Sequence, residues 1–193
     1  MSYPVVGFSI PIYNRFDHLK VLLSSLMVQT DPNWIATVVK DGPYTNGEIE
    51  IIMNYKDNRI SFIHTPNRTN NWGHTPRQMG KQLLAPHCDY VVMTGDDNYY
   101  VPTFVSELQI LAPQAPGMIY WDMVHSHYNY QHFISSLGFN QIDIGAFATR
   151  SDIASQIALP TSYAADGEFV EIYKKLYPNE LNLKIEKTLY VHN

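Results

Sequence analysis

The stretch Val5-Val6-Gly7-Phe8-Ser9-Ile10-Pro11-Ile12-Tyr13-Asn14-Arg15 decides the fold of this 193-residue chain. Its apolar run ends at a proline, which is typical of a short buried strand. From Phe16 the apolar side chains recur at helical spacing, so we expect a helix that ends near Gln29. A strand that passes at once into a helix is the first unit of a parallel α/β sheet.

The same alternation extends through the first half of the chain and weakens in the second. We expect strands at 34–39, 60–64, 90–94, 118–124, 144–149 and 183–191. We expect helices around 49–55 and at 76–84, 102–111 and 166–176. Because no internal repeat or linker interrupts them, these elements predict a single α/β domain over residues 1–193. Its central sheet should be mixed and mostly parallel, with helices on both faces.

The composition fits a globular protein and excludes several classes. Hydrophobic residues make up 45% of the chain and charged residues 16%, which supplies enough apolar material for a core. Thirteen Lys and Arg against eighteen Asp and Glu give a net charge of −5, so we expect no nucleic-acid partner. The single Cys88 excludes an intramolecular disulfide and a multi-cysteine zinc site. Since no apolar run of about 18 residues and no signal-peptide pattern is present, we expect a soluble, cytoplasmic protein without a transmembrane segment.

Polar side chains follow several expected strands at the point where each strand ends. Asp41 follows the second strand, and Asp96, Asp97 and Asn98 follow the fourth. The carboxyl ends of parallel strands meet at one edge of a sheet, which is where ligands bind in such folds. Carboxylate oxygens suit Mg²⁺ or Mn²⁺, which are usually completed by water and phosphate oxygens. The sequence therefore predicts a metal–diphosphate ligand at this edge.

Four motifs in the first 110 residues carry a more specific signal. They are residues 8–15, residues 22–30 with the continuation Val38-Val39-Lys40-Asp41-Gly42, residues 71–78 and residues 90–102. In this order they resemble the opening strand, helix, asparagine–glycine loop and DXD strand of glycosyltransferase family 2. The resemblance implies a single GT-A domain, with a nucleotide-binding half over 1–112 and an acceptor and catalytic half over 113–193.

The same resemblance assigns roles to individual residues. It implies that the nucleotide-sugar is bound by Pro11, Tyr13, Arg15, Asp41, Gly73, Arg77, Asp96, Asp143 and Gly145, with Asp41 recognising uracil. It implies that Mn²⁺ or Mg²⁺ is held by Asp97, Asp96, Asn98 and His192. The family places its aspartates two apart, whereas this chain has them adjacent; we take Asp97 as the ligand and Asp96 as its near partner. For His192, a frayed chain end is the equal alternative.

An inverting transferase needs a carboxylate that removes the proton of the acceptor hydroxyl. Ala165-Asp166-Gly167-Glu168-Phe169 resembles the family's acid-containing motif at the start of a helix, so we assign Asp166 as the base and Glu168 as its runner-up. The helix dipole there favours an ionised Asp166. An ordinary helix cap explains the same position. His125 and His127 alternate onto one strand face, and polar surface or acceptor contact is favoured over zinc binding.

Together these features predict a metal-dependent transferase that moves a hexose from a UDP-sugar, either UDP-glucose or UDP-galactose, to a hydroxyl acceptor with inversion. The acceptor is a saccharide, lipid or protein glycan, and the short chain suggests an open acceptor side with some donor hydrolysis. Two alternatives remain: a retaining transferase and a nucleotide-sugar-binding module without transfer activity. A nucleotidyltransferase is disfavoured because the loop after the first strand lacks a glycine-rich motif. The oligomeric state is not predicted.

Overall fold

The computed structural model describes residues 3–193. Its strands are β1 (Val6–Ile12), β2 (Trp34–Lys40), β3 (Ile60–His64), β4 (Tyr90–Met93), β5 (Tyr99–Tyr100), β6 (Met118–His125), β7 (Gln131–Phe133), β8 (Phe147–Arg150) and β9 (Asn182–His192). Its α-helices are α1 (Phe16–Met27), α2 (Asn46–Ile52), α3 (His74–Leu84), α4 (Phe104–Leu111), α5 (Ser151–Gln156) and α6 (Ala165–Leu176). Short 3-10 helices are η1 (Ala85–His87), η2 (Ala112–Gln114) and η3 (Ser126–Tyr128).

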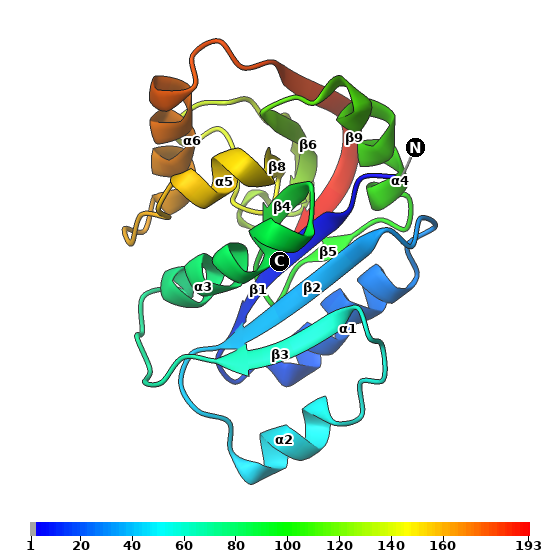
Figure 1. Ribbon diagram of the computed structural model, residues 1–193, viewed down its shortest axis with the longest axis vertical. Coiled ribbons are helices and arrows are strands. Elements are labelled where there is room, and N and C mark those ends of the chain that lie inside the picture. The colour runs from blue at the N-terminus through cyan, green and yellow to red at the C-terminus, as the bar shows by residue number, and fades with distance from the viewer. Residues whose placement is uncertain (1–2) are drawn as a thin grey trace.

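The strands form one mixed sheet in the order β3-β2-β1-β4-β8-β6-β9-β5, with β7 added beside β6. The pairs β3·β2, β2·β1 and β1·β4 are parallel, as the regular first half predicts. Every antiparallel pair involves a strand of the second half. Helices α1 and α4 lie on one side of the sheet, and α3, α5 and α6 on the other (Figure 1). The expected α/β class, with a mixed sheet and helices on both faces, is confirmed.

The alternation of β1 explains how the helices reach its two faces. Phe8 packs its ring against Phe104 of α4, with the ring centroids 5.8 Å apart. Ser9, on the opposite face, donates a hydrogen bond to the carbonyl of Arg77 on α3 at 2.8 Å. Gly80 of α3 lies so close to Ser9 that no Cβ fits between them. This close approach brings the start of α3 to the carboxyl end of β1.

Several expected boundaries differ from the structure; the helix expected around 49–55, for example, is α2, which begins at Asn46 behind a capping box of Thr45 and Glu48. Two further differences also have local reasons. The strand expected from Ile144 begins only at Phe147, because the preceding residues form a turn in which Asp143 accepts the Gly145 N–H at 2.8 Å. The helix expected from Pro76 begins at His74, where the Asn71 side chain accepts the N–H of Thr75. Proline is tolerated in that first turn, because its missing N–H has no partner within the helix. The short elements β5, β7 and α5 were not predicted.

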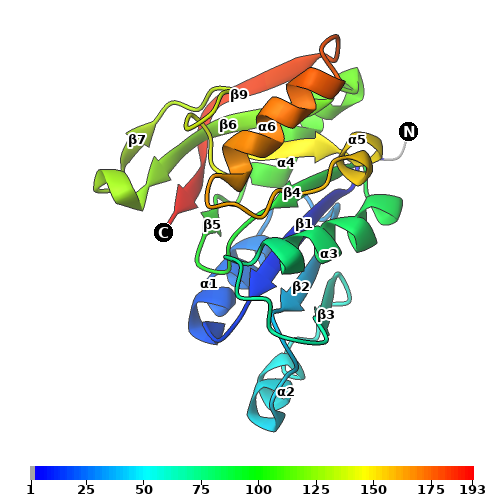
Figure 2. The same ribbon diagram turned by 90° about the vertical axis from the view of Figure 1, so that its left-hand side faces the viewer.

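The last strand, β9, brings the C-terminus back to the edge where the first half has its predicted site. It runs parallel to β6 with His192 opposite His125, so the frayed end considered for His192 is wrong. Figure 2 shows this red strand passing beside β6 and β5. Within residues 3–193, no helix is long and apolar enough to cross a membrane.

Candidate active site

A cavity of about 300 Å³ lies where β1, β2 and β4 end, and we call it the first cavity. All seven nucleotide-sugar residues predicted in the first half of the chain line it, namely Pro11, Tyr13, Arg15, Asp41, Gly73, Arg77 and Asp96. Its other lining residues include Arg68, Asn70 and Trp72. Residues scattered over some 85 positions of sequence are thus gathered in one place. The fold does this because the carboxyl ends of parallel strands share an edge.

Asp41 is a buried carboxylate at one wall of the first cavity. Its Oδ1 accepts the backbone N–H and the hydroxyl of Thr69, both at 2.7 Å, and its Oδ2 accepts the N–H of Asn70 at 2.9 Å. Burial opposes ionisation, but these hydrogen bonds outweigh it and lower the pKa of Asp41. Nearby, the Arg68 guanidinium stacks over the Tyr13 ring at 3.8 Å. The wall therefore offers an ionised acceptor beside a flat cationic surface.

Arg77 separates the first cavity from a second one, because its side chain lines both. Its Nε donates to the carbonyl of Thr94 and its Nη1 to that of Trp72, both at 2.8 Å. Burial lowers the pKa of this guanidinium, and Asp143 and Asp96 act against that shift. Gly73 caps the helix with φ +79°, where a Cβ would lie 2.9 Å from that of Pro11. Glycine at this position lets the loop close over β1 and fixes the arginine.

Arg15 clamps the two aspartates that follow β4. Its guanidinium donates to both oxygens of Asp96 and, at 2.6 Å, to Asp97. Burial raises the pKa of Asp96 and outweighs the opposing effect of Arg15. Arg15, which the resemblance assigned to nucleotide-sugar binding, thus compensates the charge of both carboxylates.

The predicted metal ligands fit a divalent cation only in part. Asp96 and Asp97 supply the hard oxygens that such a cation prefers. The Asn98 amide, however, donates to Thr94 Oγ1 at 3.2 Å and accepts the Asn193 N–H at 3.2 Å. Within residues 3–193, no three His, Cys, Asp or Glu side chains are grouped to hold a metal. A cation at the aspartates therefore needs oxygens from water and from the ligand, and it needs Arg15 to move away.

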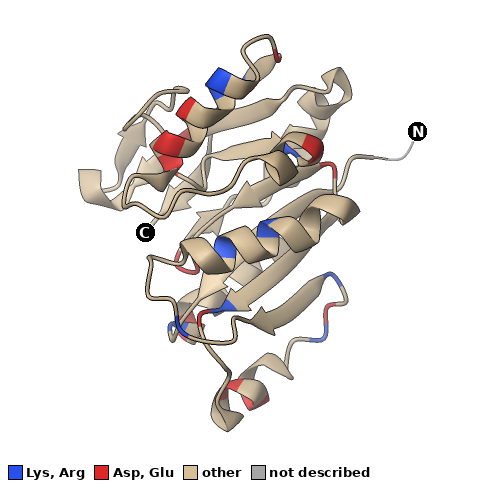
Figure 3. Ribbon diagram, turned by 60° about the vertical axis from the view of Figure 1, so that its left-hand side comes forward, with Lys and Arg blue, Asp and Glu red and all other residues tan. Residues whose placement is uncertain are grey.

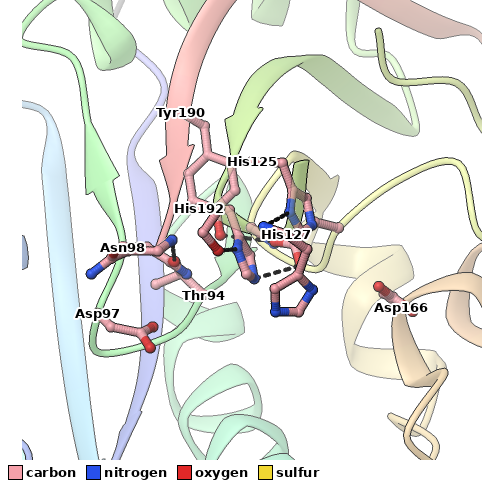
Figure 4. Close-up of polar contacts among 12 residues, drawn as sticks. Thr94, Asp97, Asn98, His125, His127, Asp166, Tyr190 and His192 are labelled. Atoms are coloured by element: carbon pink, nitrogen blue, oxygen red, sulfur yellow. Dashed lines mark hydrogen bonds and ion pairs between the residues drawn. The ribbon is translucent and has the colours of Figure 1, made fainter. Parts of the chain in front are cut away.

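His192 lies in a cluster of imidazoles with His125 and His127, apart from Asp97 (Figure 4). Its ring stacks on His125 with centroids 4.1 Å apart, and its Nδ1 lies 3.1 Å from Ser126 Oγ. Burial, followed by the neighbouring His192, lowers the pKa of His125 to about 4. His127 belongs to η3 rather than to the strand, so the expected shared strand face is wrong. Its ring still lies 5.1 Å from that of His125.

Asp166 lines a second cavity of about 270 Å³ and a third of about 360 Å³ beside it. It is the second residue of α6, after the cap residue Ala164, so the helix-cap explanation is wrong. Burial, opposed by the Gly167 N–H, raises the pKa of this carboxyl, whereas its place at the start of a helix led us to expect a group that ionises readily. A raised pKa suits a group that must take up a proton. Glu168 lines none of the three cavities.

The loop between β7 and β8 supplies the remaining predicted residues. Asp143 lines the second cavity and accepts the Tyr190 hydroxyl at 2.8 Å. Gly145 does not line the three cavities; a Cβ there would overlap the Tyr190 ring. Its role in the structure is to let Tyr190 pack beneath the loop.

Figure 3 shows Asp and Glu at the start of α6 and Lys at its end, the order that complements a helix dipole.

Several residues that line the cavities were not among the predicted site residues, including Asn70, Trp72, Asn140 and Tyr163. Arg68, whose position after a strand left a solvated charge and a phosphate contact equally open, lines the first cavity as well. Trp72 is 64% exposed and Tyr163 is 77% exposed, which is unusual for large aromatic side chains. Trp72 lies inside the asparagine–glycine motif, so its place in the motif could have drawn attention to it. Tyr163 has no such signal, since it lies in a loop before α6.

The fold is a mixed α/β sheet with a cavity at the carboxyl ends of its parallel strands, and comparison with known families identifies the class of protein. The family described as "Glycosyl transferase family 2" matches residues 8–128, which is more than half of the chain. The chain therefore belongs to glycosyl transferase family 2, and the resemblance drawn from its motifs is confirmed. The match ends at Tyr128, so Asp143 and Asp166 lie outside it.

Similar proteins extend this result to the fold. An uncharacterized glycosyltransferase of Rickettsia bellii (strain RML369-C) is 34% identical over 65 residues, which cover 34% of this chain and 9% of that protein. The crystal structure of S. aureus TarS 1-349 has a TM-score of 0.78 at 16% identity, covering 98% of this chain and 60% of TarS 1-349. The mannosyltransferase PcManGT from Pyrobaculum calidifontis, in complex with GDP-Man and Mn²⁺, gives a TM-score of 0.71 at 15% identity over 100% of this chain and 57% of its own.

These solved structures share the GT-A fold, which confirms the fold class. TarS 1-349 has also been solved in complex with UDP and with UDP-GlcNAc. The chain matches about a tenth of the length of its Rickettsia relative and 60% of TarS 1-349.

Proposed function

We propose that this chain is a glycosyltransferase that binds a UDP-sugar in the first cavity and transfers its hexose to a hydroxyl group in the second. The observation that carries the proposal is that the two cavities are adjacent and share part of their wall. Trp72 and Arg77 line both, whereas Asp166 lines the second but not the first. The donor would thus have its uracil in the first cavity and its sugar in the second, beside the carboxyl group of Asp166. We propose UDP-glucose or UDP-galactose as the donor.

The side chains around Asp41 in the wall of the first cavity suit the recognition of a uracil ring. The Oδ1 of Asp41 accepts the Thr69 N–H, the Thr69 hydroxyl and, at 3.5 Å, the Thr65 hydroxyl. Among the described residues, its Oδ2 accepts only the Asn70 N–H, and each carboxylate oxygen has about two acceptor positions. The remaining position can accept the ring N–H of uracil, while Tyr13 and Arg68 provide a flat surface. The UDP complexes of TarS 1-349 are consistent with the same nucleotide.

In the transfer step, Asp166 takes up the proton of the acceptor hydroxyl while that oxygen bonds to the anomeric carbon. The bond from this carbon to the diphosphate breaks, and UDP leaves with the electron pair, so the configuration inverts. Asp97, with Asp96 beside it, would hold Mn²⁺ or Mg²⁺ together with water and diphosphate oxygens. Such a cation neutralises the charge of the leaving diphosphate. Asn98 and His192 have other partners and are weaker candidates as ligands.

The division of the cavities supports two functional halves within the one domain. Every residue that lines the first cavity lies within 1–112, and every residue that lines the third lies within 113–193. The second cavity takes residues from both halves. We therefore assign the donor to the first half and the acceptor and base to the second.

The test is calorimetric titration of UDP with Mn²⁺, Mg²⁺ or EDTA, on the wild type, Asp97→Ala and the control Asp17→Ala. Asp17 is an exposed aspartate in the first turn of α1. We expect tight binding that needs the cation, is lost in Asp97→Ala and is retained in Asp17→Ala. Binding that ignores both EDTA and Asp97 contradicts the metal assignment, and absence of UDP binding contradicts the donor.

Turnover separates this proposal from its two alternatives. Release of UDP from UDP-glucose or UDP-galactose, lost in Asp166→Asn with UDP binding retained, supports a transferase with Asp166 as base. UDP binding without turnover for any acceptor indicates a binding module. A first product whose anomeric configuration matches that of the donor indicates a retaining enzyme.

A further inference from the structure

The second and third cavities form one hollow on the acceptor side of Asp166. They share six lining residues, which are His125, His127, Asn140, Asp143, Tyr163 and Asp166. Figure 4 shows the imidazoles of this hollow facing Asp166 across it. Its volumes of about 270 and 360 Å³ leave room for more than one sugar ring.

Two large aromatic side chains stand at the rim of this hollow. The rings of Trp72 and Tyr163 have their centroids 6.2 Å apart and their planes inclined at 76°, so they form the two sides of a corner, although the residues come from different halves of the chain. They are 64% and 77% exposed, so neither ring contributes much to a core. By contrast, the other two tryptophans, Trp34 and Trp121, are 1% and 0% exposed. Exposed aromatic rings grouped at a cavity are characteristic of a binding surface.

The backbone around the hollow is left-handed in two places, which is strained for Trp72 and readily adopted by asparagine. Trp72 has φ +54° and Asn140 has φ +58°, and both line the second cavity. A left-handed conformation costs a side-chain-bearing residue about 1–2 kcal/mol. The hydrogen bond from Arg77 to the Trp72 carbonyl helps to hold this conformation. Strain retained in this way is concentrated at ligand clamps in proteins.

The charges of the hollow indicate which ligands it accepts. Asp143 and Asp166 place two carboxyl groups in its wall, and Arg77 is its only lining Lys or Arg. That guanidinium lies at the end nearest the first cavity, where the diphosphate is proposed to bind. A phosphorylated or carboxylated acceptor would therefore be repelled, whereas a neutral polyhydroxyl ligand finds acceptors and donors at Asn140 and His127.

We propose that Trp72 and Tyr163 form an angled aromatic platform for a pyranose ring of a neutral saccharide acceptor, which stacks on the Trp72 ring, contacts the Tyr163 ring with its edge and directs one of its hydroxyl groups at Asp166. This rests on the proposed function, which it deepens by naming the class of acceptor. The apolar C–H face of the sugar covers the Trp72 ring, its edge contacts the Tyr163 ring, and its hydroxyl groups reach the polar wall. A lipid or an anionic glycan is the wrong class for this site.

The platform can be tested by intrinsic fluorescence, because Trp72 is the only one of the three tryptophans that is exposed. The neutral probes are cellobiose, maltose, lactose and chitobiose; the contrasting probes are a hyaluronan disaccharide and vesicles of phosphatidylglycerol. We expect at least one neutral disaccharide to quench and blue-shift the emission of the wild type. We expect Tyr163→Ala to weaken that binding about tenfold, as loss of one aromatic contact of roughly 1.4 kcal/mol implies, and Tyr163→Phe to restore it.

The control is Tyr3→Ala, because Tyr3 is 69% exposed and lines none of the three cavities. Saccharide binding by Trp72→Phe and Trp72→Ala is measured by calorimetry, because these variants lack the fluorescent side chain. Only the alanine variant should lose saccharide binding. Equal binding by Tyr163→Ala and the wild type overturns the platform. So does preference for the anionic disaccharide or the vesicles, or binding of UDP with no neutral disaccharide bound. Failure of UDP binding itself instead counts against the proposed function.

Discussion

Lys81 of α3 is a fully buried lysine whose charge should make folding depend on pH. Its Nζ donates to the carbonyl of Ile157 and lies 5.7 Å from the Phe169 ring centre, and no carboxylate pairs with it within residues 3–193. Burial lowers the pKa of this ammonium from 10.5 to about 8. The unfolded chain therefore binds more protons than the folded one between those two pH values. The free energy of unfolding therefore rises as the pH increases from about 8 to 10.5.

The perturbation that isolates this effect is Lys81→Met, which keeps the length of the side chain and removes the charge. Each pKa unit is worth about 1.4 kcal/mol, so the stability of the wild type relative to the variant should rise by about 2 kcal/mol from pH 7.5 to pH 10. The assay is urea denaturation of both proteins at each pH, followed by circular dichroism. Taking the difference removes all other groups that titrate equally in both.

A difference in unfolding free energy that stays constant over this range refutes the reasoning. It would mean that the Ile157 carbonyl and the Phe169 ring compensate the ammonium fully, so that burial does not govern its pKa. At pH 7.5 alone, the sign of the change is set by two opposing effects. The variant loses a hydrogen bond to Ile157 but no longer buries a charge. The pH dependence is therefore the decisive quantity.

Two further predictions follow from the packing of α3 and the position of Asp166. Gly80→Ala should destabilise the fold by about 1–3 kcal/mol, because its Cβ would overlap Ser9 and press on Val39. The control is Gly47→Ala in α2, whose Cβ meets nothing within 4 Å and which should be neutral or stabilising. Thermal denaturation of both variants and the wild type measures the difference. If Asp166 is the base, kcat/KM should fall about tenfold per pH unit below the pKa of its carboxyl, which is raised above the ordinary 3.8. The measurement is the dependence of kcat/KM on pH. The same fall at low pH in Asp166→Asn would contradict the assignment.

The sequence predicted the architecture well where local patterns carry the information. Apolar spacing located every strand of the first half except the two-residue β5, whose length gives no period to detect. The order of the motifs identified the family, and seven residues chosen from strand ends and motifs line one cavity. Boundaries were wrong where side chains compete with the backbone, as at Asp143, whose carboxylate accepts the Gly145 N–H and delays β8.

The sequence by itself determined the parallel first half of the sheet and the edge at which polar residues collect, because both follow from short-range periodicity and from strand direction. Only the tertiary structure decided which of those residues meet. Arg15 reaches Asp96 and Asp97 across 81 and 82 positions, and Trp72 faces Tyr163 from the other half of the chain. These contacts depend on how loops close over the sheet and on what each side chain must pair with once buried. The clamp at the aspartates and the aromatic rim of the hollow are therefore properties of the folded chain.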